Sequence, residues 1–223
     1  MKIDGLKSEL KNLGVNPQIL DKYIPSITNS MTPYILEERE MRVTQMDIFS
    51  RLMMDRIIWI STPVQDIMAS IIQAQLMFLN SVDKKKDITM HINTPGGVVH
   101  AGLGIVDVME WISNDVQTIN VGQCASMGAV LLGAGTKGKR LTLPSASVMI
   151  HQVSGGTQGH VMDIDIASAE IKRVNNQLFT KLSDYTGKTV KKIKADANRD
   201  LWLDAENSIK YGLVDELITP MKK

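Results

Sequence analysis

Two side chains that could act as nucleophiles lie close together in the stretch VGQCASMGAVLLGAG, residues 121–135: the thiol of Cys124 and the hydroxyl of Ser126. A serine hydroxyl is a weak nucleophile at neutral pH unless a base takes its proton and an acid orients that base. Cys124 precedes Ser126 on the strand side of a turn, where a free cysteine usually serves as a small buried hydrophobic residue. We therefore predict Ser126 as the nucleophile and keep Cys124 as the weaker alternative.

The sequence offers four histidines as the base, and His151 is the best placed of them. It ends the apolar strand SVMI just before a glycine-containing segment, so it lies at the mouth of a strand. His91 alternates with apolar residues in DITMHIN, which indicates a structural imidazole. His100 at a helix start and His160 in the Gly-rich SGGTQGH are expected at the surface. His151 is therefore the predicted general base.

The segment NRDLWLDAENS supplies two candidates for the acid that orients the base. Asp204 precedes Ala205, Glu206 and Asn207, a pattern typical of a helix N-cap. Asp200 has no such structural explanation and is the predicted acid. The order Ser, His, Asp along the chain is no objection, because a triad is defined by its geometry.

Two glycine-containing segments could bind an anion. In NTPGGVVHAG, the turn after a strand has glycine amides that can approach a ligand closely, although a plain turn explains the motif equally well. GAGTKGKR, residues 133–140, fits a phosphate loop up to its last position. There Arg140 replaces the Ser or Thr that would bind magnesium, and the segment follows a helix instead of a strand, so we reject a phosphate loop.

The elements that must position these residues alternate between short apolar strands and helices. Strands are predicted at residues 57–61, 87–93 and 118–122, with a pair of strands near RLTLP and SVMIH. Helices are predicted in MDIFSRLMMDR, VQDIMASIIQAQLMFL and VHAGLGIVDVMEWI, from about Met127, and from about Asp163 to Tyr185. This rhythm is typical of parallel βαβ units, an α/β fold. It places Ser126 at the carboxyl end of a parallel strand, where such folds locate their chemistry.

Composition excludes several classes of protein. A chain of 223 residues with 43% hydrophobic residues can bury a sizeable core. Its net charge of +1 gives no electrostatic case for nucleic acid. One cysteine allows no internal disulfide, the charged start lacks a signal peptide, and no apolar run reaches the roughly 20 residues of a membrane span. We expect a cytoplasmic protein without metal or other cofactor that binds neither nucleic acid nor membrane.

Taken together, the spaced segments closely resemble the ClpP family, the serine peptidase subunit of the Clp protease. The resemblance covers about residues 32–218. It rests on SRLMMDRIIWI, AQLMFL, INTPGG, GQCASMGAVLL, GTKGKR, MIHQ, GGTQGH and YGLVDE. It implies a ClpP/crotonase-like α/β fold for residues 32–223, after an N-terminal appendage at 1–31. It also implies a protruding handle at about 152–187, with a Gly-rich strand at 154–160 followed by the long helix.

The resemblance also implies roles and partners. Ser126, His151 and Asp200 would form the triad, and the backbone amides of Gly97 and Met127 would form the oxyanion hole. Heptameric rings would stack as a tetradecamer that encloses the active sites, and a ring-shaped AAA+ ATPase would unfold proteins and feed them in. The expected activity is that of a serine endopeptidase on unfolded proteins and peptides.

Three features leave alternatives open. The first 30 residues are longer than the short leader that the family often removes, so their processing is open. Cys124 stands where members often carry Ala, and Arg199 is either a surface residue or a partner across the ring interface. The rival functions are a crotonase-like acyl-CoA enzyme, which needs an acidic base facing the oxyanion wall, and a non-catalytic ring subunit, which should lack triad residues.

Overall fold

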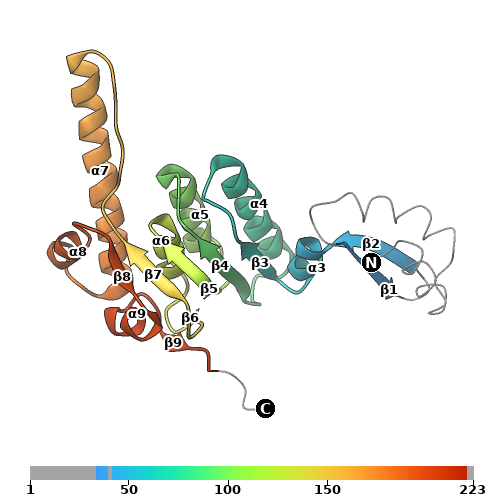
Figure 1. Ribbon diagram of the computed structural model, residues 1–223. Coiled ribbons are helices and arrows are strands. Elements are labelled where there is room, and N and C mark those ends of the chain that lie inside the picture. Colours follow the sequence, from blue (N-terminus) through green and yellow to red (C-terminus); the bar gives the residue numbers. More distant parts are fainter. Residues whose placement is uncertain (1–33, 40–41, 220–223) are drawn as a thin grey trace, which may run out of the picture. The chain divides into compact units, whose positions relative to one another are not determined.

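The computed structural model describes residues 34–39 and 42–219, with side chains from Met46 onward (Figure 1). The chain divides into two compact units, Met1–Asp55 and Arg56–Lys223. The appendage predicted at residues 1–31 lies outside the described residues, and the division at residue 32 stays a prediction.

The first unit contains an antiparallel hairpin followed by a short helix. Strands β1 (Tyr34–Arg39) and β2 (Arg42–Asp47) pair along their whole length. Helix α3 (Ile48–Met54) follows directly, as its sequence pattern predicted. The Asp47 carboxylate accepts hydrogen bonds from the backbone N–H groups of Phe49 and Ser50, each at 3.0 Å. These bonds satisfy two donors that a helix start leaves without partners.

The second unit is built on a seven-stranded, mostly parallel sheet, which confirms the predicted α/β class. Its main path runs in the order β3 (Ile57–Ile60), β4 (Ile88–Thr94), β5 (Val116–Ala125), β6 (Arg140–Thr142) and β9 (Glu216–Leu217), with all neighbours parallel. Beside this path, β7 (Ser147–Ile150) pairs parallel with β5, and β8 (Leu201–Leu203) pairs antiparallel with β7.

From β3 to β6, each pair of consecutive strands is joined by one helix, as predicted. The helices of this unit are α4 (Asp66–Val82), α5 (Val99–Trp111), α6 (Met127–Gly133), α7 (Val161–Thr186), α8 (Val190–Asp196) and α9 (Ala205–Tyr211). Helices α4 and α5 pack side by side against the sheet (Figure 1). The buried residues of α4 are Ala69, Ile72, Leu76 and Leu79, which form one apolar stripe at helical spacing.

Strand β5 has different partners along its two halves. Residues 118–120 pair with β6, whereas residues 123–125 pair with β7. The two strands predicted near RLTLP and SVMIH therefore follow one another along β5 and do not pair with each other. Since β7 is parallel to β5, both strands deliver their carboxyl ends to the same edge of the sheet. Ser126 and His151, the first residues after β5 and β7, therefore lie at this edge.

The segment before α7 differs from the sequence prediction. Residues 151–158 belong to no helix or strand, so the strand predicted at 154–160 is wrong for this chain. A strand forms only beside a partner, and no described strand runs along this segment. The segment instead runs alongside α7, the helix that comes after it in the sequence and extends away from the sheet (Figure 1). Helix α7 itself begins at Val161 and ends at Thr186, close to the predicted limits.

Candidate active site

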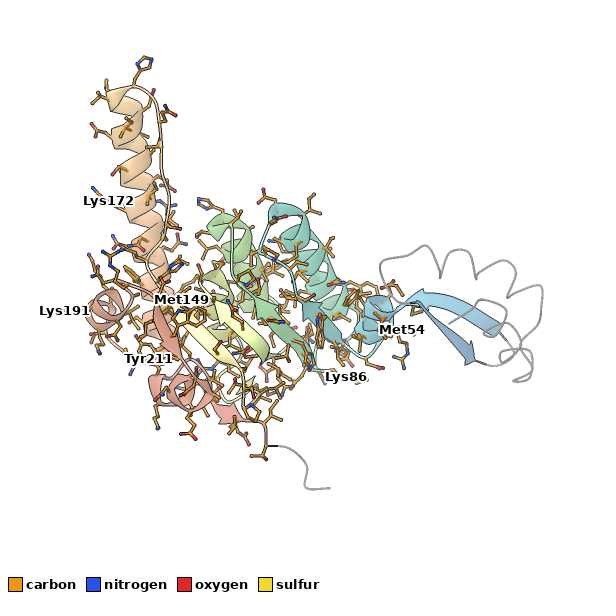
Figure 2. The ribbon with its side chains drawn as sticks, in the orientation of Figure 1. Met54, Lys86, Met149, Lys172, Lys191 and Tyr211 are labelled. Atoms are coloured by element: carbon orange, nitrogen blue, oxygen red, sulfur yellow. The ribbon has the colours of Figure 1, made fainter. Side chains whose placement is uncertain are left out.

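Ser126 occupies a sharp turn between strand β5 and helix α6. Its φ of 54° and ψ of −119° are unusual for a residue with a side chain, and such geometry is found where a surrounding structure enforces it. The Ser126 N–H donates to the carbonyl of Met149 on β7 at 2.8 Å, and its carbonyl accepts from Ala129 N–H at 3.0 Å. Met149 is labelled in Figure 2. The turn is therefore fixed by a neighbouring strand and by the helix that it starts.

The small residues around this turn are required by close packing. A Cβ on Gly128 would lie 2.7 Å from the Thr94 side chain, and one on Gly133 would lie 2.9 Å from the Tyr185 ring. The two glycines of α6 thus allow the helix to approach β4 and α7, while Ser126 is half-buried at the turn. Close packing therefore explains the glycines of this segment. It does not explain Ser126, whose hydroxyl contacts His151.

Strands β7 and β8 bring His151 and Asp200 together. In their antiparallel register Ile150 lies opposite Leu201, so His151, one residue after Ile150, meets Asp200, one residue before Leu201. His151 Nδ1 lies 3.2 Å from Asp200 Oδ1, and His151 Nε2 lies 2.8 Å from Ser126 Oγ. These two contacts form one hydrogen-bonded line from carboxylate to imidazole to hydroxyl. Such a line can move a proton from the hydroxyl to the imidazole.

The Gly96–Gly97 turn packs directly against the Ser126 turn. A Cβ on Gly96 would lie 2.7 Å from Ser126 Cβ and 2.8 Å from the Met127 nitrogen, so only glycine permits this approach. Gly97 forms a parallel bridge with Val64, where Val98 N–H donates to the Val64 carbonyl at 2.8 Å. A Cβ on Gly97 would lie 2.2 Å from that carbonyl oxygen. The segment NTPGG therefore forms a second wall beside the serine.

A pocket opens beside these groups, and it is lined mainly by apolar side chains. Its lining residues are Gly97, Val99, Ser126, Met127, Val130, Ile150, His151, Gln152, Val153, Ser154, Leu178 and Leu182. Within the described chain, neither Gly97 nor Met127 uses its backbone N–H in a hydrogen bond with another group. Both amides are therefore available to an anion at the pocket, and Met127 adds the partial positive charge of a helix start.

The sequence did not identify the side chains that shape this pocket. Leu178 and Leu182 come from the base of α7, more than fifty residues after Ser126 in the chain. Their spacing of four places them on one face of a helix, but the same spacing describes any core-facing stripe. No acidic side chain is among the described pocket residues, so the base that an acyl-CoA enzyme would need there is not present in this lining.

Cys124 is enclosed in the core and does not line the pocket. Its exposed fraction is 0%, and its thiol lies 3.5 Å from the Ile92 carbonyl, to which it donates. Burial strongly raises the pKa of the Cys124 thiol, which keeps it protonated. Because the thiolate is the reactive form, the environment does not favour Cys124 as a nucleophile.

The other residues considered from sequence have separate places. His91 stacks on Trp59 with ring centroids 5.0 Å apart, and its burial lowers its pKa and favours the neutral form. His100 and His160 are exposed. Asp204 caps α9 by accepting from Asn207 N–H at 2.8 Å, which confirms its predicted structural role.

The rejected phosphate-loop segment uses its basic residues within the fold. Lys139 donates to Asp115 at 2.9 Å, and Arg140 Nε donates to Asp215 at 2.9 Å. The segment joins α6 to β6, the reverse of the order that a phosphate loop requires. Within the described ranges, no group of three acidic, cysteine or histidine side chains could hold a metal ion. No helix among the described residues is long and apolar enough to cross a membrane.

Comparison with known proteins gives consistent matches over almost the whole chain. Residues 38–221 match the family model described as Clp protease. The chain is 50% identical over 215 residues to the ATP-dependent Clp protease proteolytic subunit of Bacteroides fragilis (strain YCH46), covering 96% of this chain and 98% of that protein. It is 48% identical over 217 residues to the protein of the same description from Porphyromonas gingivalis, covering 97% of this chain and 98% of that protein.

Proposed function

Because this chain belongs to the Clp protease family, a family of serine peptidases, we propose that Ser126, His151 and Asp200 are its catalytic triad. The observation that carries the proposal is the hydrogen-bonded line from Asp200 through His151 to Ser126 at the mouth of a pocket. The chain keeps all three groups, so a purely architectural role in a ring leaves their alignment unexplained.

In the proposed reaction, His151 Nε2 takes the proton of Ser126 Oγ while that oxygen attacks the carbonyl carbon of a peptide bond. The backbone amides of Gly97 and Met127 donate to the negative oxygen of the tetrahedral intermediate. His151 then gives its proton to the nitrogen of the leaving amine, and an ester to Ser126 remains. A water molecule, deprotonated by His151, attacks that ester, and His151 returns the proton to Ser126 Oγ as the acid leaves.

The position of the two amides supports their role as an oxyanion hole. Gly97 and Met127 both border the pocket, and the Gly96–Gly97 turn lies in direct contact with the Ser126 turn. Loss of one donor in a serine protease raises the barrier by about 2.7 to 4 kcal/mol, so the placement of these backbone groups matters as much as that of the side chains.

We further propose that the substrates are unfolded proteins and peptides, cleaved after apolar residues. The pocket beside Ser126 is lined by Val99, Met127, Val130, Ile150, Leu178 and Leu182, and no Asp, Glu, Lys or Arg is among its described lining residues. An apolar substrate side chain would lose its contact with water there, which is favourable. A charged one would enter without a partner.

The proposal includes assembly into two stacked heptameric rings fed by an AAA+ unfoldase in the cytoplasm. Its support is the description of the relatives as proteolytic subunits of an ATP-dependent protease. Exposed apolar side chains on two helices are suited to contacts between copies: Ile67, Ile71 and Phe78 on α4, and Val161, Met162 and Ile166 on α7. The buried free thiol of Cys124 is compatible with a reducing compartment.

A fluorophosphonate probe tests the triad directly, because it reacts with an activated serine. Mass spectrometry of the labelled protein should locate one adduct on Ser126, and Ser126→Ala should abolish both the adduct and peptide hydrolysis. Cys124→Ala is the matched control and should be labelled like the unmodified protein. An adduct on Cys124, or undiminished labelling of Ser126→Ala, would contradict the proposal.

A further inference from the structure

One hydrogen bond joins the long helix α7 to the wall of the substrate pocket. The side-chain oxygen Oδ1 of Asn175 accepts the backbone N–H of Val153 at 2.9 Å. Val153 and the next residue, Ser154, form part of the pocket lining, two and three residues after His151. An asparagine on a helix thus holds the backbone of a segment that itself forms no helix or strand.

Asn175 belongs to the stripe of α7 that faces the pocket. Leu178 and Leu182 follow it at three and seven residues, a spacing that puts all three on one face of a helix. Both leucines are buried and line the pocket. Lys172, one turn earlier on α7, is exposed (Figure 2). On this face of α7, Leu178 and Leu182 line the pocket, and Asn175 binds the backbone of the lining segment at Val153.

The position of Val153 does not depend on the bonds that hold the triad. The ladder with β8 ends at Ile150, and the Gln152 N–H donates to the Ala197 carbonyl at 2.8 Å. His151 thus lies between two backbone anchors and makes its own contacts with Ser126 and Asp200. After Gln152, the bond to Asn175 is the last that the described residues provide before residue 160. Loss of the bond between Asn175 and Val153 should therefore free the pocket wall at residues 153–154 and leave the triad in place.

We propose that Asn175 is a positioning residue that fixes the distance between the wall at residues 153–154 and the leucines of α7. That distance sets the size of the apolar side chain that the pocket accepts. The inference rests on the proposed peptidase function and adds to it a determinant of specificity that lies on α7 and contacts neither the scissile bond nor the triad.

The test compares Asn175→Ala, Asn175→Asp and the matched control Asn176→Ala, all in the full-length protein. Alanine is the strongest helix former, so the first variant should preserve α7. Aspartate keeps an oxygen that can accept the Val153 N–H. Asn176 is the neighbouring residue with an exposed side chain. Fluorogenic peptides that place leucine or phenylalanine in the pocket report kcat and KM, and the rate of fluorophosphonate labelling reports Ser126 activation.

For Asn175→Ala we expect KM of the leucine peptide to rise about three- to tenfold, as loss of one hydrogen bond implies, with kcat within a factor of about two. The preference for leucine over phenylalanine in kcat/KM should fall by a similar factor, because a released wall admits the larger ring. The labelling rate should stay unchanged. Asn175→Asp and Asn176→Ala should both resemble the unmodified protein.

Unchanged KM and unchanged preference in Asn175→Ala would overturn the inference. So would an equal loss in Asn175→Asp, since the accepting oxygen is then not what matters, or a fall in labelling rate parallel to kcat, which would indicate a general structural defect. Failure of the proposed function is visible separately, because the unmodified protein would then neither cleave the peptides nor be labelled at Ser126.

Discussion

The thiol of Cys124 and the hydroxyl of Ser126 are separated by a single residue and lie in opposite surroundings. Cys124 faces inward from β5 toward β4, where burial opposes the thiolate. Ser126 lies one residue beyond the end of the strand, where the chain turns and the hydroxyl meets an imidazole. Residues two apart on a continuous strand share a face, so the end of β5 at Ala125 and the turn at Ser126 separate the surroundings of the two nucleophiles.

Cys124 should resist thiol reagents while the protein is folded. Because burial raises its pKa, iodoacetamide at pH 7.5 should modify Cys124 only after denaturation. Mass spectrometry before and after addition of urea measures this difference. Cys124→Ala should keep peptide hydrolysis and lose about 1 kcal/mol of stability from the smaller core side chain. Rapid modification of the native protein that abolishes hydrolysis would reverse the assignment of the nucleophile.

Asp200→Asn should lower kcat by about 10² to 10⁴-fold with little change in KM. The amide can no longer accept the Nδ1–H of His151 as a carboxylate does, so it favours the wrong tautomer of the imidazole. The carboxylate lies 3.2 Å from Nδ1 and its side chain is 60% exposed, so water can partly replace it and we expect a smaller loss than in a buried triad. Steady-state hydrolysis of a fluorogenic peptide measures the effect, and Asp204→Asn, at the cap of α9, is the control. Unchanged turnover in Asp200→Asn would remove Asp200 from the mechanism.

At the scale of the elements, the site depends on backbones that approach without side chains between them. The turn at Gly96 contacts the turn at Ser126, and α6 approaches β4 through Gly128. Each contact brings together segments that are about thirty residues apart in the chain. A glycine in the sequence indicates that a close approach is allowed, but it does not say which segment will make it.

Gly96→Ala should abolish most of the activity, because its methyl group would collide with backbone atoms of the Ser126 turn. The added Cβ would lie 2.6 Å from the Ala125 carbonyl oxygen, and flexible side chains cannot relieve that contact. Gly138 is a matched control, since its φ of 87° resembles the 90° of Gly96 but nothing lies within 4 Å of its Cβ position. Gly138→Ala should lose only about 1 to 2 kcal/mol of stability and keep its kcat/KM. Equal activity of the two variants would show that the Gly96 contact is not needed.

Local patterns predicted most of the secondary structure, and they failed where pairing partners decide. Apolar runs such as IIWI and ITMHIN became β3 and β4, and the cap at Asp204 was identified from its own turn. The hairpin β1–β2 was missed because YILEER and RVTQMD do not alternate regularly between apolar and polar residues. The division of β5 between β6 and β7 depends on register, which no single segment contains.

In the candidate site, too, local patterns predicted some residues, and contacts between distant segments were missed. Ser126, His151 and Asp200 were predicted because each lies beside a strand with a residue type suited to proton transfer. The contact between Asn175 and Val153 was not, since it joins a helix to an irregular segment and involves a common surface residue. The lining of the pocket by Leu178 and Leu182 likewise depends on how α7 packs, which is a property of the whole second unit.

At the scale of the whole second unit, one ion pair connects three distant parts of the chain. Arg140 at the start of β6 is 4% exposed and pairs with Asp215, just before β9, through Nε at 2.9 Å. It also donates to the Tyr185 carbonyl near the end of α7 at 2.9 Å. Asp215 accepts further bonds from the backbone N–H groups of Gly138 and Arg140. The pair therefore fixes the edge of the sheet and the base of α7 relative to each other.

Asp215 should make the stability of the protein depend on pH in acid. Burial of its carboxylate alone would raise the pKa, but the hydrogen bonds from Arg140 and from the two backbone amides outweigh burial and hold the pKa of Asp215 below its ordinary 3.8. A lowered pKa in the folded state means that the contribution is complete above about pH 3.8 and is lost as the pH falls through the folded value. At pH 7, Asp215→Asn should lose about 3 kcal/mol, because Arg140 remains buried without its partner.

Urea unfolding of the unmodified protein and of Asp215→Asn at neutral and acidic pH measures this dependence. The difference in unfolding free energy should be the same at about pH 7 and pH 5 and should be smaller at about pH 3, where protonation of the unfolded chain has begun to favour unfolding. Glu206→Gln is the control, since the Glu206 side chain is 77% exposed in its contact with Lys210 and should shift neither value measurably. A difference that stays constant to about pH 3 would mean that the charge of Asp215 does not hold this corner together, and that packing around Arg140 does so instead.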